Sequence, residues 1–359
     1  MTSEPAEPEI AARLLTYLRA ALPAPDLTYA EPLTRITGGF DTLIYGFRLT
    51  AVPGPFSGPL ILRVFRQGNP WITLSTAQRV RFETTVQNTV ADTGYAAPRV
   101  LLSETNPARL GGAFLIMERM AGDIMLDYFF RPSTIFFRLP RLLAETQARL
   151  HSLDSQALLQ AIEAEHVPAR ALTVADWMEK VQRQIEEAEL DGLQPAIDWV
   201  RQNSPPDRLP TVICHGDFHP SNLLVHKGAV SGVIDWPWVR IAAPEYDVGS
   251  TIAILSQGPV DPPRFVHPVV NWFRRGMVSR YLRAYRYLRP LDDRALRYFE
   301  ALRCLGFLLE AGQQRQADAG VIPRPEKRTA FAATYVVNSV AARFCEITAL
   351  TLTLPPLTK

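Results

Sequence analysis

One short stretch of the chain brings together residue types that could transfer a phosphoryl group. Residues 215–222 read His-Gly-Asp-Phe-His-Pro-Ser-Asn. Asp217 is thus followed five positions later by the amide of Asn222, and Asp235 comes thirteen positions after that. Kinase-type phosphoryl transfer uses one carboxylate to receive the proton of the attacking hydroxyl, and an Asn/Asp pair to hold magnesium on the nucleotide phosphates. The three residue types and their spacing fit that chemistry.

The residues around this trio predict the elements that must position it. A β-like run at 211–214 precedes the loop, and a second run at 223–225 follows it. The Lys227-Gly228 pair indicates a tight turn, and a third β-like run at 232–234 ends just before Asp235. The segment therefore predicts a strand, a catalytic loop and a hairpin whose far end carries the second carboxylate.

Two simpler interpretations compete with this one. His215, Asp217 and His219 alternate, so on a strand all three would point to one side as in a zinc site. Glycine and proline interrupt that strand, and a zinc site leaves the second carboxylate unexplained. A surface turn without chemistry accounts for His-Gly-Asp alone, but not for an amide and another acid at kinase spacing.

The segment resembles the catalytic core of the aminoglycoside phosphotransferase and choline kinase-like family, the small-molecule relatives of protein kinases. In that family, the catalytic loop has the pattern His-Gly-Asp, four variable positions and Asn. The metal motif is Ile-Asp-Trp or Ile-Asp-Phe. Both patterns are intact here. The resemblance implies that Asp217 orients and deprotonates an acceptor hydroxyl and that Asn222 and Asp235 bind Mg²⁺. It also implies that His215 braces the loop and that Asp247 ties it to the following helix.

The resemblance implies an α+β, bilobal protein-kinase-like fold. Residues 1–118 would form a nucleotide-binding lobe of antiparallel sheet plus helix, with a further helix near 9–21. Residues 119–359 would form a larger, mostly helical lobe for catalysis and acceptor binding. A hinge near 117–122 would join the two and offer the adenine ring a dry slot beside Met117, Glu118 and Met120.

Paired glycines in the first hairpin are candidates for covering the nucleotide. Gly38 and Gly39 lie between two β-like runs, and without a Cβ they let backbone N–H groups approach phosphates. A plain hairpin turn is the simpler interpretation. Asp41-Thr42 departs from the Ser-Asn of many relatives.

A basic strand residue and an acidic helix residue form the other expected nucleotide contact. By position within the resemblance, Arg63 would grip the α- and β-phosphates in place of the commoner lysine. Glu83, in the middle of the helix predicted at 75–92, would pair with Arg63 and hold it in place. An exposed strand arginine and a solvated glutamate are the alternatives.

Apolar periodicity predicts further helices over the second half of the chain. Their expected ranges are 137–151, 173–202 (one or two helices), 265–286, 291–314 and 328–348. Residues 258–350 hold fifteen Lys plus Arg against eight Asp plus Glu, a basic excess. Because polycationic aminoglycosides call for converging carboxylates, we expect an acceptor that is neutral or anionic.

The composition excludes several other classes. The 359-residue chain has a net charge of +2, so no global field would hold nucleic acid. It has neither an apolar run of membrane length nor a basic, apolar leader, and its three distant cysteines suggest reduced thiols in a cytoplasm. We expect a cytoplasmic monomer or homodimer that uses Mg²⁺ with ATP or GTP. A catalytically dead nucleotide sensor or scaffold, and a transition-metal hydrolase, remain as alternatives.

Overall fold

The computed structural model divides by internal contacts into two compact units, which we describe separately. It describes residues 6–22, 24–36, 42–50, 52, 54–66, 74–129, 137–206, 209–258, 263–324 and 328–356. The first unit comprises Met1–Asp123, Gln156–Ala169 and Leu224–Pro237, and the second comprises Ile124–Ser155, Arg170–Leu223 and Trp238–Lys359. Two later segments were expected in the C-terminal lobe. By this division they belong to the same unit as the N-terminal residues.

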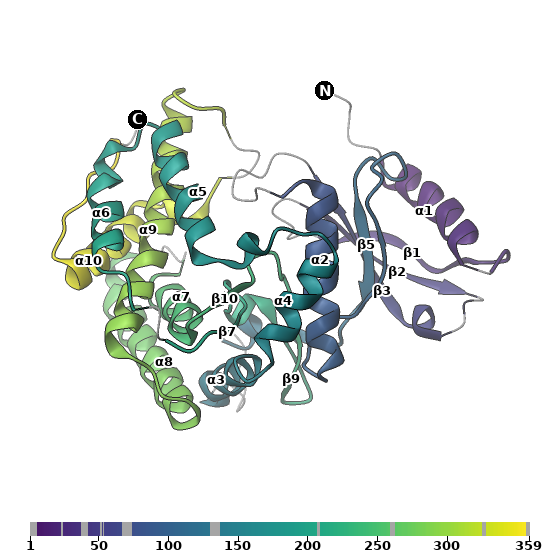
Figure 1. Cartoon of the computed structure of the whole chain (residues 1–359), viewed down its shortest axis with the longest axis horizontal. Helices are drawn as coiled ribbons and strands as arrows, with labels where there is room; N and C mark the ends of the chain where they lie inside the picture. The colour runs from purple at the N-terminus through teal and green to yellow at the C-terminus, as the bar shows by residue number, and fades with distance from the viewer. Residues whose placement is uncertain are drawn as a thin grey trace. The chain divides into compact units, whose positions relative to one another are not determined.

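A five-stranded antiparallel sheet forms the centre of the first unit (Figure 1). Its strands, in spatial order, are β1 (Thr28–Ile36), β2 (Thr42–Thr50), β3 (Pro59–Phe65), β5 (Phe114–Glu118) and β4 (Val100–Glu104). A register shift between Glu31 and Thr34 accommodates Pro32, since a bulge on an edge strand tolerates a residue without an N–H.

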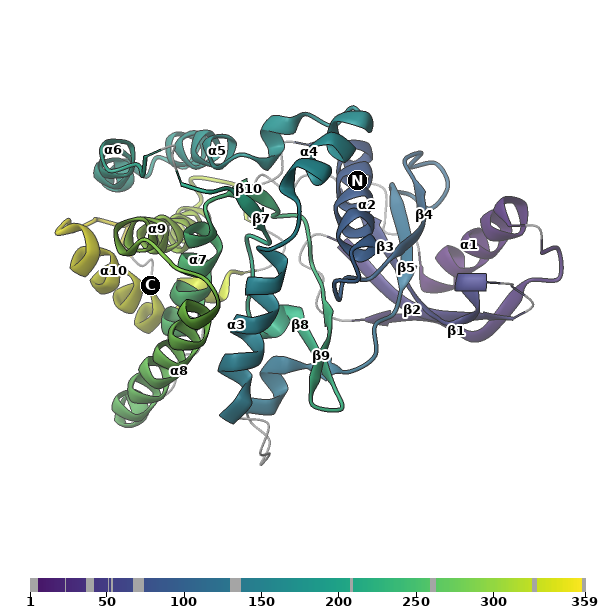
Figure 2. The same ribbon diagram turned by 60° about the horizontal axis from the view of Figure 1, so that its bottom comes forward.

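Alternating side chains give this sheet two apolar faces, and each carries a helix (Figure 2). On one face, Leu60 and Leu62 of β3 join a cluster with α1 (Glu7–Ala21). On the other face, Ile61 and Phe65 pack with Val80 of α2 (Thr76–Asp92). Because side chains alternate along a strand, Arg63 lies on the α2 face.

The first unit also contains a helix and a hairpin from later in the chain. Helix α4 spans Ser155–Ala164, and strands β8 (Leu223–His226) and β9 (Ala229–Val233) pair beside the two-residue strand β6 (Asp123–Ile124). The hairpin turns at Lys227 and Gly228, whose φ angles are 49° and 81°, the positive values that a two-residue hairpin loop demands. This is the turn that the sequence predicts.

Helices dominate the second unit, with one small sheet of β7 (Val212–Cys214) and β10 (Arg240–Ala242). The helices are α3 (Leu139–Leu150), α5 (Val174–Glu187), α6 (Gln194–Gln202), α7 (Pro244–Gln257), α8 (His267–Leu288), α9 (Asp293–Asp318) and α10 (Thr334–Thr348). Helix α7 packs on α9, α3 on α8 and α10 on α9. All the helices predicted from periodicity are present.

Candidate active site

The catalytic loop leaves β7 through a backbone conformation that requires glycine. Gly216 has a φ of 81°, and a Cβ built there would lie 2.1 Å from the carbonyl oxygen of Trp238. Both the angle and the missing space exclude a side chain.

Asp247, at the start of α7, anchors this turn. One carboxylate oxygen accepts hydrogen bonds from the backbone N–H of His215 at 3.0 Å, and the other accepts from that of Gly216 at 2.8 Å. His151 at the end of α3 contacts the same carboxylate at 3.1 Å through Nε2 and the Tyr285 hydroxyl at 2.6 Å through Nδ1. The predicted tie between the loop and the following helix is present.

The pKa of Asp247 reflects these contacts. Burial alone raises the pKa of this carboxyl, but the hydrogen bond and charge of His151 outweigh burial and hold the pKa below its ordinary value. The anchor is therefore a carboxylate at neutral pH, which lets both of its oxygens accept hydrogen bonds from the loop.

Asp217 is held from two sides. Its Oδ1 accepts a 2.6 Å hydrogen bond from Nη2 of Arg303 on α9. Its Oδ2 lies 3.2 Å from both Nε2 of His219 and Nδ2 of Asn222. Burial raises the pKa of Asp217, but the charges of His219 and Arg303 outweigh burial and hold this pKa well below its ordinary value. Asp217 is thus a carboxylate at neutral pH and is able to accept hydrogen bonds.

The amide of Asn222 is oriented by the loop itself. Its Nδ2 donates to the backbone carbonyl of Asp217 at 2.9 Å, and the residue ends the short 3₁₀ turn Pro220–Asn222. With the N–H end of the amide committed to Asp217, the oxygen end is the part suited to a cation. Amide and carboxylate oxygens are hard ligands of the kind that Mg²⁺ prefers, so Asn222 in the second unit and Asp235 in the first each carry a group suited to this ion.

A buried ion cluster occupies the α2 face of the sheet in the first unit. Nη1 of Arg63 donates to Oε2 of Glu83 at 2.8 Å, and Nε of Arg79 donates to Oε1 at the same distance. Nη2 of Arg63 lies 3.5 Å from Oδ1 of Asp235, and both guanidinium groups lie over the Phe65 ring. The predicted pairing of Arg63 with Glu83 is present.

Asp235 itself has an uncommon backbone. Its φ is 69°, in the left-handed region that aspartate tolerates better than most residues. The next residue, Trp236, is fully buried, donates from Nε1 to the Val233 carbonyl at 2.9 Å and meets the Tyr95 ring edge to face. Packing of Trp236 thus fixes the chain while the Asp235 side chain stays 43% exposed.

The structure describes some, but not all, of the other residues predicted to contact a nucleotide. Gly38 and Gly39 lie outside the described residues. Met117 is buried within β5, and Met120 is half-buried. The N–H of Glu118 already donates to the carbonyl of Arg99 at 3.0 Å, so this N–H is committed within the protein.

Neither a metal cluster nor a membrane helix is found in the part of the chain that the structure describes. Among those residues, no three His, Cys, Asp or Glu side chains are grouped so as to hold a metal ion. No described helix combines the length and apolar character needed to cross a membrane.

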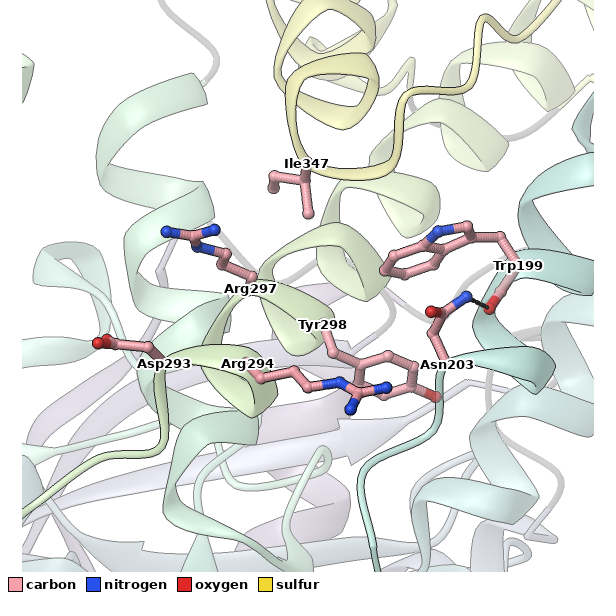
Figure 3. A pocket seen from close by; sticks show the side chains of 7 residues that line it. All are labelled: Trp199, Asn203, Asp293, Arg294, Arg297, Tyr298 and Ile347. Carbon is pink, nitrogen blue, oxygen red and sulfur yellow. Dashed lines mark hydrogen bonds between the residues drawn. The ribbon is translucent and has the colours of Figure 1, made fainter.

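A separate pocket of about 370 Å³ lies in the second unit between α6, α9 and α10 (Figure 3). The Trp199 and Tyr298 rings stack there at 6.0 Å, and Asn203 donates to the Trp199 carbonyl. No residue of the 215–222 loop lines this pocket, and we assign it no role.

Sequence reasoning missed two arginines of the candidate site. Arg79 lies four residues before Glu83 on one helix, and that spacing is the signal that would have revealed the pair. Arg303 is 86 residues from Asp217, and no local pattern connects them. Only the packing of α9 in the fold brings Arg303 to the loop.

Comparison with known proteins defines the class to which this fold and loop belong. Residues 32–301 match the phosphotransferase enzyme family, which is more than half of the chain. The chain therefore belongs to that family, as the loop and metal motifs predicted.

Solved structures share the fold at low sequence identity. A protein of Ralstonia eutropha assigned as an aminoglycoside phosphotransferase aligns with a TM-score of 0.62 and 17% identity, over 94% of this chain and 98% of that one. An ethanolamine kinase of Plasmodium vivax aligns with a TM-score of 0.55 and 14% identity, over 88% and 82%. The GDP complex of aminoglycoside 2'-phosphotransferase-IIIa gives 0.52 and 14%, over 94% and 98%. The expected protein-kinase-like fold is confirmed.

Curated relatives are much longer proteins. Human acyl-CoA dehydrogenase family member 11 is 26% identical over 210 residues, which cover 54% of this chain and 26% of that protein. A probable acyl-CoA dehydrogenase of Arabidopsis thaliana is 29% identical over 192 residues, 48% of this chain and 22% of that protein. The chain thus spans about a quarter of the length of these relatives.

Proposed function

We propose that this protein is a magnesium-dependent kinase that transfers the γ-phosphoryl group of ATP or GTP to a hydroxyl of a small molecule. The observation that carries the proposal is the side chain of Asp217, held by Arg303, His219 and Asn222 on a loop that Asp247 anchors. A positioned carboxylate of this kind orients a hydroxyl and takes its proton as the oxygen–phosphorus bond forms.

The chemistry requires little more than positioning and charge. The acceptor oxygen forms a bond to the γ-phosphorus, the bond to the β-phosphate oxygen breaks, and the hydroxyl proton passes to Asp217. Magnesium, when bound, neutralises the charge on the phosphates that develops during transfer. Asn222 and Asp235 would hold it, because they present the amide and carboxylate oxygens that suit this ion.

Residues of the first unit would hold the nucleotide. Arg63 is fixed by the fully buried Glu83 and offers a fork of N–H donors to phosphate oxygens. Gly38 and Gly39 would cover the phosphates. The adenine or guanine edge would meet the backbone near Met117 and Met120, but not the N–H of Glu118, which another hydrogen bond already uses.

Related structures support a nucleotide donor without fixing its base. One aligned phosphotransferase holds GDP, and another, with a TM-score of 0.51, holds AMP-PNP and hygromycin B. The acceptor panel should include aminoglycosides, ethanolamine, sugars and hydroxyacids. It should also include a hydroxyacyl-CoA, because the curated relatives are named acyl-CoA dehydrogenases.

Asp217→Asn tests the proposal directly. The amide keeps the size of the side chain but cannot take up the proton, so we expect turnover to fall roughly 10²–10⁴-fold while nucleotide affinity stays near normal. The measurement is release of ADP or GDP with each acceptor present, together with nucleotide titration of both proteins. Asp191→Asn, at an exposed carboxylate, is the control.

The same assay distinguishes the alternative of a nucleotide-binding sensor or scaffold. A sensor binds magnesium nucleotide but gives no phosphorylated product with any acceptor, and its slow hydrolysis does not respond to Asp217→Asn. A wild-type protein that neither binds nucleotide nor turns it over would overturn both functions. Metal analysis of the purified protein separately tests the hydrolase alternative, which requires a tightly bound transition metal.

A further inference from the structure

Arg303 of α9 is the strongest contact of the proposed catalytic carboxylate. Its Nη2 lies 2.6 Å from Oδ1 of Asp217, whereas the His219 and Asn222 contacts to Oδ2 are both 3.2 Å. A charge-assisted hydrogen bond at the shorter distance is the stronger one. Oδ1 is therefore held by the arginine, which fixes the orientation of the carboxylate, while Oδ2 carries two longer and weaker contacts.

Aromatic packing fixes the arginine in this position. Its guanidinium carbon lies 4.8 Å from the centre of the Phe307 ring, one helical turn along α9. Phe307 in turn stacks on Phe331 at 3.9 Å with an interplanar angle of 8°. The guanidinium group thus lies between a carboxylate and an aromatic wall, and its side chain is 26% exposed.

Other titratable groups interact electrostatically with this pair. They are His215 and His219 on the loop, Tyr246 on α7, and Cys304 and Glu310 on α9. Burial raises the pKa of Glu310, while Arg303 and a 2.9 Å hydrogen bond from Thr329 lower it. Arg303 differs from these neighbours because its positive charge is permanent, since guanidinium does not lose its proton in proteins.

We propose that Arg303 is a positioning residue that fixes the Asp217 carboxylate in the orientation that receives the acceptor hydroxyl and makes this subsite select against acceptors with an ammonium group beside that hydroxyl. The inference rests on the proposed kinase function and names its acceptor class: hydroxyl compounds that are neutral or anionic next to the reacting oxygen. A fixed cation at 2.6 Å from Asp217 repels a second cation and leaves further N–H donors for an acceptor oxygen.

Kinetics of Arg303→Met and Arg303→Lys test the positioning role. We expect Arg303→Met to lower kcat about 10–100-fold with little change in the KM for nucleotide, and Arg303→Lys to recover part of the loss. Because Arg303 lowers the pKa of Asp217, its removal should move the acid limb of kcat/KM to higher pH, and lysine should move it back. Arg280→Met, at an exposed arginine of α8, is the matched control.

Three probes with one carbon skeleton test the selection: glycerate, glycerol and 3-aminopropane-1,2-diol. We expect the kcat/KM of the wild-type protein to be lowest for the amine. Arg303→Met should reduce the difference in kcat/KM between the amine and the other two probes. Equal behaviour of Arg303→Met and Arg280→Met in kcat, pH profile and probe ratio would overturn the inference and leave the kinase proposal intact. If the wild-type protein phosphorylates nothing and hydrolyses no nucleotide, the kinase proposal itself fails.

Thermal denaturation provides a readout that needs no acceptor. A lowered pKa contributes stability that is present above the ordinary pKa of aspartate, about 3.9, and is lost as the pH falls below it. The melting temperature of Arg303→Met should therefore lie below wild type by a nearly constant amount from pH 7 to about pH 4, and the two should converge as the pH falls further. A difference that persists unchanged well below pH 4 would contradict a direct ion pair between Arg303 and Asp217.

Discussion

At the scale of single residues, Glu83 bridges two buried guanidinium groups. Its side chain is fully buried, and its two oxygens accept from Arg63 and Arg79 at 2.8 Å each. We expect Glu83→Gln to lower the free energy of unfolding by roughly 3–5 kcal/mol, because it leaves buried arginines without their countercharge. Chemical denaturation measures this difference.

Glu145→Gln provides the comparison for that measurement. Glu145 pairs with Arg141 on the surface of α3, where the two side chains are 40% and 75% exposed. Loss of an exposed pair should change stability by no more than about 1 kcal/mol. If Glu83→Gln lowers the free energy of unfolding by no more than Glu145→Gln does, the buried cluster does not stabilise the fold as its geometry indicates.

At the scale of elements, the turn between β7 and the catalytic loop depends on Gly216. Two effects act there, a φ of 81° and a contact of 2.1 Å between an added Cβ and the Trp238 carbonyl. Gly320 has nearly the same φ, 79°, but nothing lies within 4 Å of its added Cβ. We expect Gly320→Ala to cost about 1–2 kcal/mol from backbone strain alone.

Gly216→Ala should cost clearly more than Gly320→Ala, since the backbone must also shift away from Trp238. The shift moves the loop that carries Asp217, so activity should fall as well as stability. Melting temperature and turnover of both variants give the comparison. Similar losses in the two proteins would show that the crowding at Gly216 is relieved without cost.

The elements also show what sequence can and cannot predict here. Helix α2 was predictable from its capping serine, its apolar stripe and its terminal glycine, all local signals. Residues 215–222 were predictable because their chemistry lies in eight consecutive positions. Arg303 was not, because its place depends on how α9 packs in the fold, and neither spacing nor composition encodes that packing locally.

At the scale of the whole molecule, the family match runs through both compact units, since residues 32–301 include the sheet, the catalytic loop and most of the helices. Two short motifs were therefore enough to predict the fold and the family, but they did not predict the acceptor. Helices α8, α9 and α10 lie in the region where the resemblance places acceptor binding, and they carry few motifs. Their net charge includes both surface and interior residues, so it does not define the charge of an acceptor pocket.

Ligand-linked stability tests the magnesium and nucleotide roles on the intact chain. A ligand that binds only the folded protein, at 100 times its Kd, stabilises it by about 2.7 kcal/mol and raises the melting temperature by several degrees. We expect ATP or GTP with Mg²⁺ to produce such a rise, and EDTA to reduce it. Asp235→Asn should remove the magnesium-dependent part, because an amide is a weaker ligand than a carboxylate for this ion. Asp217→Asn should retain it, since Asp217 is assigned to the acceptor. A shift that is indifferent to both magnesium and Asp235→Asn would contradict the role assigned to this carboxylate.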